Sequence, residues 1–440
     1  MEDLPNRVDY LLRGATIITM NPAREILENA SIAIKGSEIA WIGEAKDAPL
    51  QFEVKHSLDC AGKLIMPGLI NVHGHWAMTL FRGMVDDITL EGWLAKVWKA
   101  EAAYMSEENV IAGAQLAMME MIRSGTTCAA DMYWHYRAST EASRRAGFRM
   151  INGPSFAEIE GFKEYRHTNQ EIALAYLDEY QDTPLIHLCV QAHSAYTTNP
   201  ELLQIVSQIA VERNLLFITH ASESVGELEM VRQKYGKRPL EVLHEHHLLG
   251  KHTLLAHCVH LTDQEIQLLA ETGTSVAHCP TSNLKLSSGI ARVSDMLKAG
   301  VNVAIGTDGA ASNNDLDLFH EAQLAALVQK GVTGDPTVLP AQKVVSMLTI
   351  DAAKAVGLQD IIGSLEVGKL ADLVVIDMDS PNLTPHYDLY SHLVYAISPH
   401  DVCHTMVNGQ ILMQDRQLTT LNEPVIKAKV CQIAKQIQAM

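Results

Sequence analysis

Met66-Pro67-Gly68-Leu69-Ile70-Asn71-Val72-His73-Gly74-His75 joins a short apolar run directly to two histidines that stand two residues apart. Side chains on an extended chain repeat with a period of two, so both imidazoles face the same side of the strand end and could hold one divalent metal ion. A lone His-x-His is a weak signal in a chain with 20 histidines. Its weight depends on what the rest of the chain places at similar positions.

Three later strand-like runs also end in a residue type that binds metals. They are Phe217-Ile218-Thr219-His220, Leu254-Leu255-Ala256-His257 and Val303-Ala304-Ile305-Gly306-Thr307-Asp308. From about Leu64 to Gly357, runs of this kind alternate with helical patterns such as Glu107 to Arg123 and Pro200 to Arg213. About eight βα units favour a closed (β/α)8 TIM-type barrel, an α/β fold, over an open doubly wound sheet. No Gly-x-Gly-x-x-Gly follows the first strand, which disfavours a dinucleotide-binding fold.

Short alternating strands also occupy both ends of the chain. They are Tyr10 to Ile18, Ala30 to Gly36, Ile39 to Gly43, Ala371 to Asp377 and Thr405 to Leu412. We therefore expect three parts: a small β-sandwich built from residues 1–64 and 365–420, a metal-dependent barrel over residues 65–364, and a closing helix over residues 421–440.

Composition narrows the possible partners. The net charge of -18 argues against nucleic acid and anionic membranes, so the substrate is expected to be small and not polyanionic. Seven cysteines without a Cys-x-x-Cys pair, together with no secretory leader after Met1, indicate reduced thiols in a cytoplasmic protein. No apolar run is long enough to span a bilayer. A homodimer is expected from the fold.

The carboxyl ends of barrel strands converge on one face, which brings distant residues together. His73, His75, His220 and Asp308 then form a possible set of three nitrogens and one oxygen around a single ion. Zn2+ suits such ligands best, with iron or manganese as alternatives. The run Leu185 to His193 offers no lysine that could bridge two metals, so one ion is expected.

Glu223 and His257 are the candidates for proton chemistry beside the ion. A divalent ion lowers the pKa of a water molecule that it binds to roughly 7, and Glu223 would be a general acid/base worth about 10²- to 10⁴-fold in rate. The alternative is a solvated glutamate at a helix start, since Glu227 and Glu229 follow. His257 is one ligand too many for a tetrahedral ion, so we expect it to orient the attacking water. This set suits hydroxide attack on a ring carbon with loss of ammonia.

Several motifs resemble the amidohydrolase superfamily, and within it the 5'-methylthioadenosine/S-adenosylhomocysteine deaminases. They are Met66 to His75, His220-x-x-Glu223, Leu255 to His260, Ser282 to Leu286, Gly306 to Asn314 and Gly363 to Val374. The metal motifs are typical of the superfamily, and the run Asp308 to Asn314 is typical of the deaminase branch. The resemblance covers nearly the whole chain. The His-x-Glu and Pro-Cys-x-x-Cys signature of the other zinc deaminase fold is missing.

The resemblance implies a role for each site residue. His73, His75, His220 and Asp308 would hold the metal, and Asp308 would also take a proton from the water. Glu223 would protonate the purine ring and His257 would steady the hydroxide. Glu101 matches the position that binds the ribose hydroxyls, and His193 matches a histidine that contacts the substrate.

Two departures from the family pattern bear on the substrate. The loop Gln191 to Tyr196 lacks two prolines that the family usually has, and Pro154 stands where some members place an arginine for the carboxylate of S-adenosylhomocysteine. Arg166 could substitute for that arginine. The uncharged 5'-methylthioadenosine is therefore the expected substrate, with S-adenosylhomocysteine as a second one. Two alternatives stay open: a deaminase or hydrolase of another N-heterocycle (guanine, oxidised purine, pterin or triazine), and a non-catalytic barrel.

Overall fold

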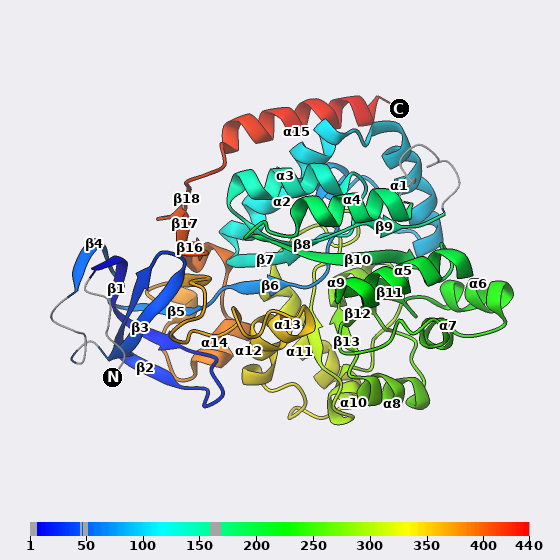
Figure 1. Ribbon diagram of the computed structural model, residues 1–440. Helices are drawn as coiled ribbons and strands as arrows, with labels where there is room; N and C mark the ends of the chain where they lie inside the picture. The colour runs from blue at the N-terminus through cyan, green and yellow to red at the C-terminus, as the bar shows by residue number, and fades with distance from the viewer. Residues whose placement is uncertain (1–6, 45, 47–51, 159–168, 440) are drawn as a thin grey trace.

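The structure is a computed structural model that describes residues 7–44, 46, 52–158 and 169–439. It has two parts, a barrel wrapped by helices and a smaller sheet beside it (Figure 1). The barrel uses the middle of the chain, and the smaller sheet uses both ends. The predicted fold is therefore confirmed.

The barrel consists of eight parallel strands that pair in the order in which the chain visits them. They are β6 (Leu69–Asn71), β7 (Thr126–Ala130), β8 (Arg149–Asn152), β10 (Ile186–Ser194), β11 (Leu216–Ala221), β12 (Thr253–His257), β13 (Ser275–His278) and β14 (Val303–Ile305), and the short β9 (Ser155–Phe156) pairs with β10. Both faces of these strands are buried: Leu254 and Ala256 pack in the barrel interior, whereas Leu255 packs under the helices. This explains why the runs are almost entirely apolar.

The seam between the first and the last strand is closed by backbone and side-chain hydrogen bonds. The Val72 amide donates to the Ile305 carbonyl at 3.4 Å, and the Asp308 amide donates to the His73 carbonyl at 3.0 Å. The Asn71 side chain donates to the Thr307 hydroxyl at 2.8 Å and accepts from the Thr307 amide at 3.1 Å. The seam therefore sets His73 and Asp308 next to each other.

Helices surround the barrel. They are α1 (Leu90–Tyr104), α2 (Glu107–Arg123), α3 (Tyr136–Ala146), α4 (Gln170–Tyr180), α5 (Pro200–Arg213), α6 (Val225–Tyr235), α7 (Pro239–Glu245), α8 (Asp263–Thr272), α9 (Pro280–Lys285), α10 (Val293–Lys298), α11 (Leu318–Thr333), α12 (Ala341–Leu348), α13 (Ile350–Ala355), α14 (Leu389–Tyr395) and α15 (Glu423–Gln438), with 3-10 turns η2 (Trp76–Phe81), η3 (Pro381–Leu383) and η4 (Pro399–Asp401). The two helices expected from periodicity, α2 and α5, have the predicted bounds. Each begins at a capping side chain, Ser106 for α2 and Asn199 for α5, which accepts a backbone N–H of the first turn.

The smaller sheet joins the two ends of the chain in one mixed sheet of nine strands. They are β1 (Arg7–Ile18), β2 (Ile26–Lys35), β3 (Glu38–Glu44), β4 (Glu53–Asp59), β5 (Lys63–Pro67), β15 (Leu373–Asp377), β16 (Val402–Val407), β17 (Gln410–Gln414) and β18 (Gln417–Leu418). β5 lies between β1 and β15, with Ile17 opposite Ile65 and Met66 opposite Val374. The expected junction at residues 64 and 65 falls inside β5, so the chain enters the barrel only at β6.

A buried ion pair links the two parts. Arg149, at the start of β8, donates through Nε and Nη2 to the two carboxylate oxygens of Asp372 at 2.7 and 2.9 Å. The Asp372 carboxylate also accepts the Asn408 amide at 2.7 Å. The side chains of Arg149 and Asp372 are 0% and 2% exposed. The pair lies at the amino ends of the barrel strands, opposite the face that carries the predicted metal ligands.

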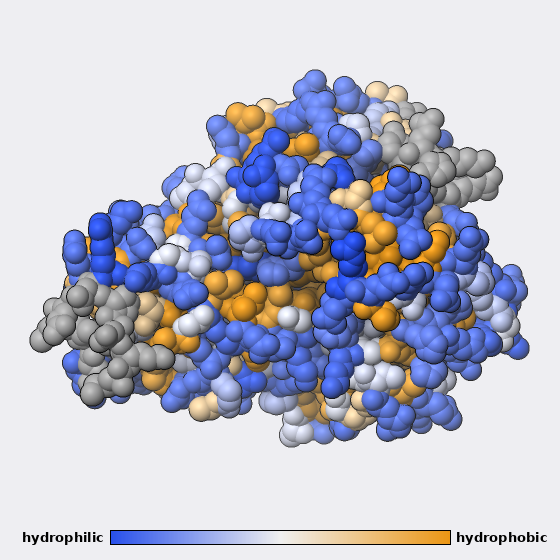
Figure 2. Space-filling view, in the orientation of Figure 1, coloured by the Kyte–Doolittle hydropathy of each residue, from blue (hydrophilic) through white to orange (hydrophobic). Residues whose placement is uncertain are grey.

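The surface seen in Figure 2 is largely hydrophilic, with hydrophobic side chains gathered mainly in the middle of that face. α15 covers α2 at one edge of the molecule, where Arg123 pairs with Glu423 at 2.6 Å (Figure 1). Within the described ranges, none of the helices is both long enough and apolar enough to cross a bilayer.

Candidate metal centre and active site

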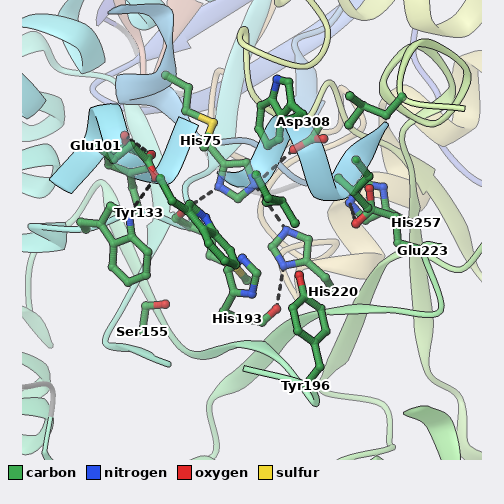
Figure 3. A pocket seen from close by; sticks show the side chains of 18 residues that line it. His75, Glu101, Tyr133, Ser155, His193, Tyr196, His220, Glu223, His257 and Asp308 are labelled. Carbon is green, nitrogen blue, oxygen red and sulfur yellow. Dashed lines mark hydrogen bonds and ion pairs between the residues drawn. The ribbon is translucent and has the colours of Figure 1, made fainter. Parts of the chain in front are cut away.

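The four predicted metal ligands converge at the carboxyl ends of the barrel strands (Figure 3). Nε2 of His75 lies 3.1 Å from Oδ1 of Asp308, and Nε2 of His73 lies 3.6 Å from the same oxygen. Nε2 of His220 lies 3.3 Å from Nε2 of His75. All four residues are buried. Residues that span most of the chain therefore meet around one point.

The surroundings aim the ligand atoms at that point. Nδ1 of His75 donates to the Met132 carbonyl at 2.5 Å, and Nδ1 of His220 donates to the His193 carbonyl at 2.6 Å, which leaves both Nε2 lone pairs facing the shared space. Nε2 of His73 is buried and has no hydrogen-bond partner among the described residues. Two sets of three ligand atoms that lie within 4.8 Å of one another share His73, one with His75 and Asp308 and the other with His220 and His257, and such sets could hold a divalent cation.

Asp308 is held by two serine hydroxyls. Ser282 and Ser312 donate to its Oδ2 at 2.6 and 2.9 Å, so Oδ1 is the oxygen left beside the histidines. Burial alone would raise the pKa of Asp308, but hydrogen bonds from His73 and His75 outweigh it and hold that pKa well below its usual value. Burial lowers the pKa of His73 to about 4 against the opposing effect of Asp308. Asp308 and His73 thus combine an ionised carboxylate with a neutral imidazole, the form that binds metals, whereas Asp308 raises the pKa of His75 to about 9 against the effect of its burial.

Glu223, just after the end of β11, and His257, at the end of β12, lie side by side. Nε2 of His257 is 3.8 Å from Oε2 of Glu223, whose side chain is 12% exposed. Nδ1 of His257 hydrogen-bonds to Oδ1 of Asn283 at 2.8 Å, and a ring nitrogen of His257 lies within 4.8 Å of nitrogens of His73 and His220. Burial raises the pKa of Glu223. A glutamate with a raised pKa beside the ligand group suits proton transfer.

The loop that carries Glu223 is fixed by Glu227. The Glu227 carboxylate accepts the Ser222 and Glu223 amides at 3.0 and 2.6 Å. Glu227 is 2% exposed, and burial raises its pKa to about 7. Glu227 lies in the first turn of α6, and its buried carboxylate holds the backbone of Glu223, which argues against the alternative that Glu223 is a solvated residue at a helix start.

A pocket opens onto the predicted metal ligands. Its lining residues are His75, Met78, Leu90, Trp93, Leu94, Trp98, Glu101, Met132, Tyr133, Trp134, Ser155, His193, Tyr196, His220, Glu223, His257, Leu286 and Asp308. In Figure 3, Glu101 and Tyr133 lie on one side of the His75 and His220 rings, and Glu223 and His257 lie on the other. A ligand that spans the pocket would meet both carboxylates. Among the described lining residues there is no lysine or arginine.

Glu101 projects from α1 into the pocket and is 1% exposed. The Tyr133 hydroxyl donates to its Oε1 at 2.5 Å, and the Trp134 indole N–H donates to its Oε2 at 3.4 Å. Burial raises the pKa of Glu101 to about 7, against the opposing effect of the Tyr133 hydrogen bond. A carboxylate this deeply buried on a ligand pocket is not a surface helix residue, which was its alternative interpretation.

His193, the penultimate residue of β10, also lines the pocket. Its ring packs against the His220 ring at 4.8 Å between centroids, and burial lowers its pKa to about 3. The altered loop is anchored by Gln191, whose side chain donates to the Asp131 carbonyl at 2.7 Å and whose amide donates to the Pro154 carbonyl at 2.9 Å. Arg166, the possible carboxylate partner, lies outside the described residues.

Sequence reasoning missed several residues that complete the site. Tyr133 and Trp134 follow the end of β7, where the polar residue Asp131 was an available signal. Ser282 and Asn283 lie in a motif noted for its resemblance alone, and their contacts with Asp308 and His257 become visible only in the folded chain.

Comparisons with known proteins agree with this site. The model of the Amidohydrolase family matches residues 64–412. The chain belongs to the amidohydrolase family. It is 41% identical to a protein of Syntrophobacter fumaroxidans named 5-methylthioadenosine/S-adenosylhomocysteine deaminase, over 98% of this chain and 99% of that one. The amidohydrolase fold is also seen in the crystal structure of an adenosine deaminase from Xanthomonas campestris with bound zinc, at a TM-score of 0.95 and 34% identity, covering 99% of this chain and 100% of that one.

A third amidohydrolase acts on a different ring. It is an atrazine chlorohydrolase from Arthrobacter aurescens TC1 complexed with zinc, with a TM-score of 0.90 and 25% identity over 97% of this chain and 100% of that one. The fold of this chain is therefore shared with zinc-bound enzymes whose names give different substrates. The choice of substrate has to come from the pocket.

Proposed function

We propose that the protein is a metal-dependent hydrolytic deaminase that converts 5'-methylthioadenosine to its inosine analogue and ammonia. The observation that carries this proposal is a pair of carboxylates, the buried Glu101 and the partly buried Glu223, at the two ends of one pocket that opens onto the metal-binding cluster. The full-length likeness to a protein named as such a deaminase supports the same activity.

His73, His75, His220 and Asp308 would hold one divalent ion per chain, with zinc as the first choice. When bound, the ion supplies hydroxide from water at neutral pH. Zinc in the related adenosine deaminase and atrazine chlorohydrolase supports this choice. Asp308, with Oδ2 held by Ser282 and Ser312, would accept the proton that this water loses.

Glu223 would donate a proton to the purine ring. Burial raises its pKa and so favours the protonated carboxyl, which would give its proton to a ring nitrogen of the purine and make the amino-bearing carbon electron-poor. His257 would orient the attacking water. Because Asn283 Oδ1 can only accept, Nδ1 of His257 carries a hydrogen, and Nε2 is the ring nitrogen that would face the water.

Glu101 would accept the two ribose hydroxyls, a role that suits an ionised carboxylate with free lone pairs. Trp98 and Trp134 also line the pocket, pack with Ala102 and Ala157, and would offer an apolar surface to the 5' substituent. A thioether sulfur makes favourable contacts with aromatic rings. The described lining residues include no lysine or arginine, so they offer no partner for the charged tail of S-adenosylhomocysteine. We therefore propose 5'-methylthioadenosine as the better substrate, by about 1 to 3 kcal/mol in transition-state binding.

An ammonia-release panel on metal-loaded protein tests the proposal. 5'-Methylthioadenosine should give the highest kcat/KM, S-adenosylhomocysteine a lower one, and free adenine a poor one because it lacks the ribose. Equal efficiency on both thioethers would refute the 5' preference. Turnover of guanine or a triazine without turnover of any adenosine derivative would refute the nucleoside activity and favour the alternative that the atrazine chlorohydrolase represents.

We also propose that the protein is a homodimer and that it works in a reducing compartment. All seven cysteines are free thiols, and five of them are buried, which supports a reducing compartment such as the cytoplasm. A homodimer in solution is tested by light scattering at several protein concentrations. A mass of one chain throughout would refute it.

A further inference from the structure

A buried carboxyl group on α11 ties together two segments that lead to the metal ligands. Glu321 is 0% exposed and is not one of the residues that line the pocket. Its Oε2 accepts the Thr281 amide at 3.2 Å, and its Oε1 accepts the side-chain amide of Asn313 at 2.8 Å. Burial raises the pKa of Glu321 to about 8, but both oxygens of a carboxyl group can accept an N–H whether or not the group is ionised. The two hydrogen bonds therefore do not require one protonation state.

The first of these hydrogen bonds caps α9. This helix has only six residues, and its N-cap residue Cys279 makes no side-chain hydrogen bond to the first turn. A helix of this length is not stable alone, and its first N–H groups need acceptors from elsewhere. Pro280 has no N–H, so Thr281 carries the first one inside the helix, and Glu321 accepts it. α11 thereby supplies the cap that α9 lacks.

α9 carries the partners of two site residues. The Ser282 hydroxyl donates to Oδ2 of Asp308 at 2.6 Å, and Oδ1 of Asn283 accepts from Nδ1 of His257 at 2.8 Å. Both partners are buried. A shift of the first turn of α9 would therefore disturb both contacts at once, one to a predicted metal ligand and the other to the residue proposed to orient the water.

The second hydrogen bond of Glu321 holds the backbone beside Asp308. Nδ2 of Asn313 donates to Glu321 and also to the Thr307 carbonyl at 2.7 Å. Exchanging the amide oxygen and nitrogen would set the oxygen against that carbonyl, so the orientation of the Asn313 side chain is fixed. The carbonyl belongs to the peptide bond that leads into Asp308, whose φ of 62° is disfavoured for a residue with a Cβ and persists where the surroundings hold it.

We propose that Glu321 is a positioning residue that aligns Asp308 and His257 together, by holding α9 and the segment after β14 to the same point of α11. The inference rests on the proposed metal site and deaminase function. Because Glu321 does not line the pocket, its loss should lower metal affinity and kcat while KM stays close to that of the wild type.

The test compares Glu321→Leu, which removes both hydrogen bonds, with Gln329→Leu, a matched variant on the same helix. Gln329 is 3% exposed, and it accepts the Ser294 amide at 3.1 Å and donates to the Ala291 carbonyl at 2.8 Å. It therefore ties α11 to the start of α10, which carries none of the predicted site residues. Both variants lose buried hydrogen bonds, and chemical denaturation of the metal-free proteins measures this common loss of stability.

The readouts are zinc affinity, by competition with a chelator, and kcat and KM of the zinc-saturated enzyme with 5'-methylthioadenosine. Glu321→Leu should weaken zinc binding by about 10- to 100-fold and lower kcat by about 10-fold or more. Gln329→Leu should keep the zinc affinity and kcat of the wild type. In the double variant Glu321→Leu/Ser282→Ala, the loss of zinc affinity should be smaller than the product of the two single losses, because both changes act on Asp308.

Several results would overturn the inference. They are wild-type zinc affinity and kcat in folded Glu321→Leu, equal losses in Gln329→Leu, a change confined to KM, and single losses that multiply fully in the double variant. Loss of zinc affinity or of kcat alone would show that Glu321 does not align both residues. If Glu321→Leu does not fold, Glu321→Gln, which keeps one acceptor and turns an NH2 group to the other donor, should show the same two losses with smaller factors, and wild-type values there would also overturn the inference. Wild-type protein that binds no divalent ion, or that releases no ammonia from any adenine nucleoside, would instead defeat the proposed function.

Discussion

The pH dependence of ribose recognition follows from the burial of Glu101. Burial raises its pKa to about 7, and only the ionised form is a strong acceptor for two hydroxyl groups. Glu101 is then about 90% ionised near pH 8 and about 10% near pH 6. Because protonation removes the strong acceptor, the preference for a substrate that carries ribose hydroxyls should fall by up to about tenfold between these two pH values.

The assay compares two substrates as a ratio of kcat/KM values, which cancels titrations that affect both substrates equally. We would measure kcat/KM for 5'-methylthioadenosine and for its 2',3'-dideoxy analogue from pH 5.5 to pH 9 and divide the two values at each pH. The ratio should rise with pH and reach a plateau above pH 8. Glu101→Gln should lower the plateau by about 30-fold, since two charge-assisted hydrogen bonds become neutral ones, and should flatten the curve. A flat ratio in wild type, or a rising ratio that survives in Glu101→Gln, would refute the assignment of Glu101 to the ribose.

Three further outcomes are expected. Glu223→Gln should keep its metal and lose about 10²-fold or more in kcat, because proton transfer is lost while the shape of the side chain is kept. The control Glu229→Gln, at an exposed position, should not differ from wild type. Loss of metal in proportion to the loss of activity would contradict the role of Glu223 in proton transfer. Elemental analysis should find about one zinc per chain. Ser282→Ala removes a hydrogen bond to Asp308 and should weaken metal binding by about 10- to 100-fold, as measured by competition with a chelator. Unchanged metal affinity would show that the hydrogen bond from Ser282 to Asp308 does not support metal binding. Arg149→Met should lower the free energy of unfolding by about 3 to 5 kcal/mol in chemical denaturation, because Asp372 stays buried without its partner, while kcat/KM of the folded enzyme stays unchanged. The solvent-exposed Arg144, which pairs with Glu141, gives the matched control, Arg144→Met, which should leave the free energy of unfolding close to that of the wild type.

Much of the fold and the metal cluster could be predicted from the sequence because the signals are local. A His-x-His at a strand end, and His220 and Asp308 at two later strand ends, need only the period of a strand and the convergence of barrel strands to be placed together. The bounds of α2 and α5 follow from apolar periodicity and capping side chains. Each of these features can be read within a window of about 15 residues.

The contacts that could not be predicted join distant residues. The Tyr133 hydroxyl on Glu101, the Asn283 side chain on His257 and the Ser282 hydroxyl on Asp308 connect positions 26 to 32 residues apart, and nothing local distinguishes these side chains from other polar loop residues. The burial of Glu227 depends on how tightly one loop turns over its strand. Such features are set by packing between elements, which a single sequence does not reveal.

The position of the metal ligands beside the seam between β6 and β14 also affects when the chain can bind a metal ion during its synthesis. Asn71 and Thr307, whose side chains stitch the seam, are 236 residues apart, and the ligands His73 and Asp308 lie beside them. A growing polypeptide therefore carries three ligands long before the fourth leaves the ribosome, and an ion that requires all four can be retained only after the last strand docks on the first. An ion bound there would join the first strand of the barrel to the last one. At a free ion concentration of 100 times its Kd, it would stabilise the closed barrel by about 2.7 kcal/mol.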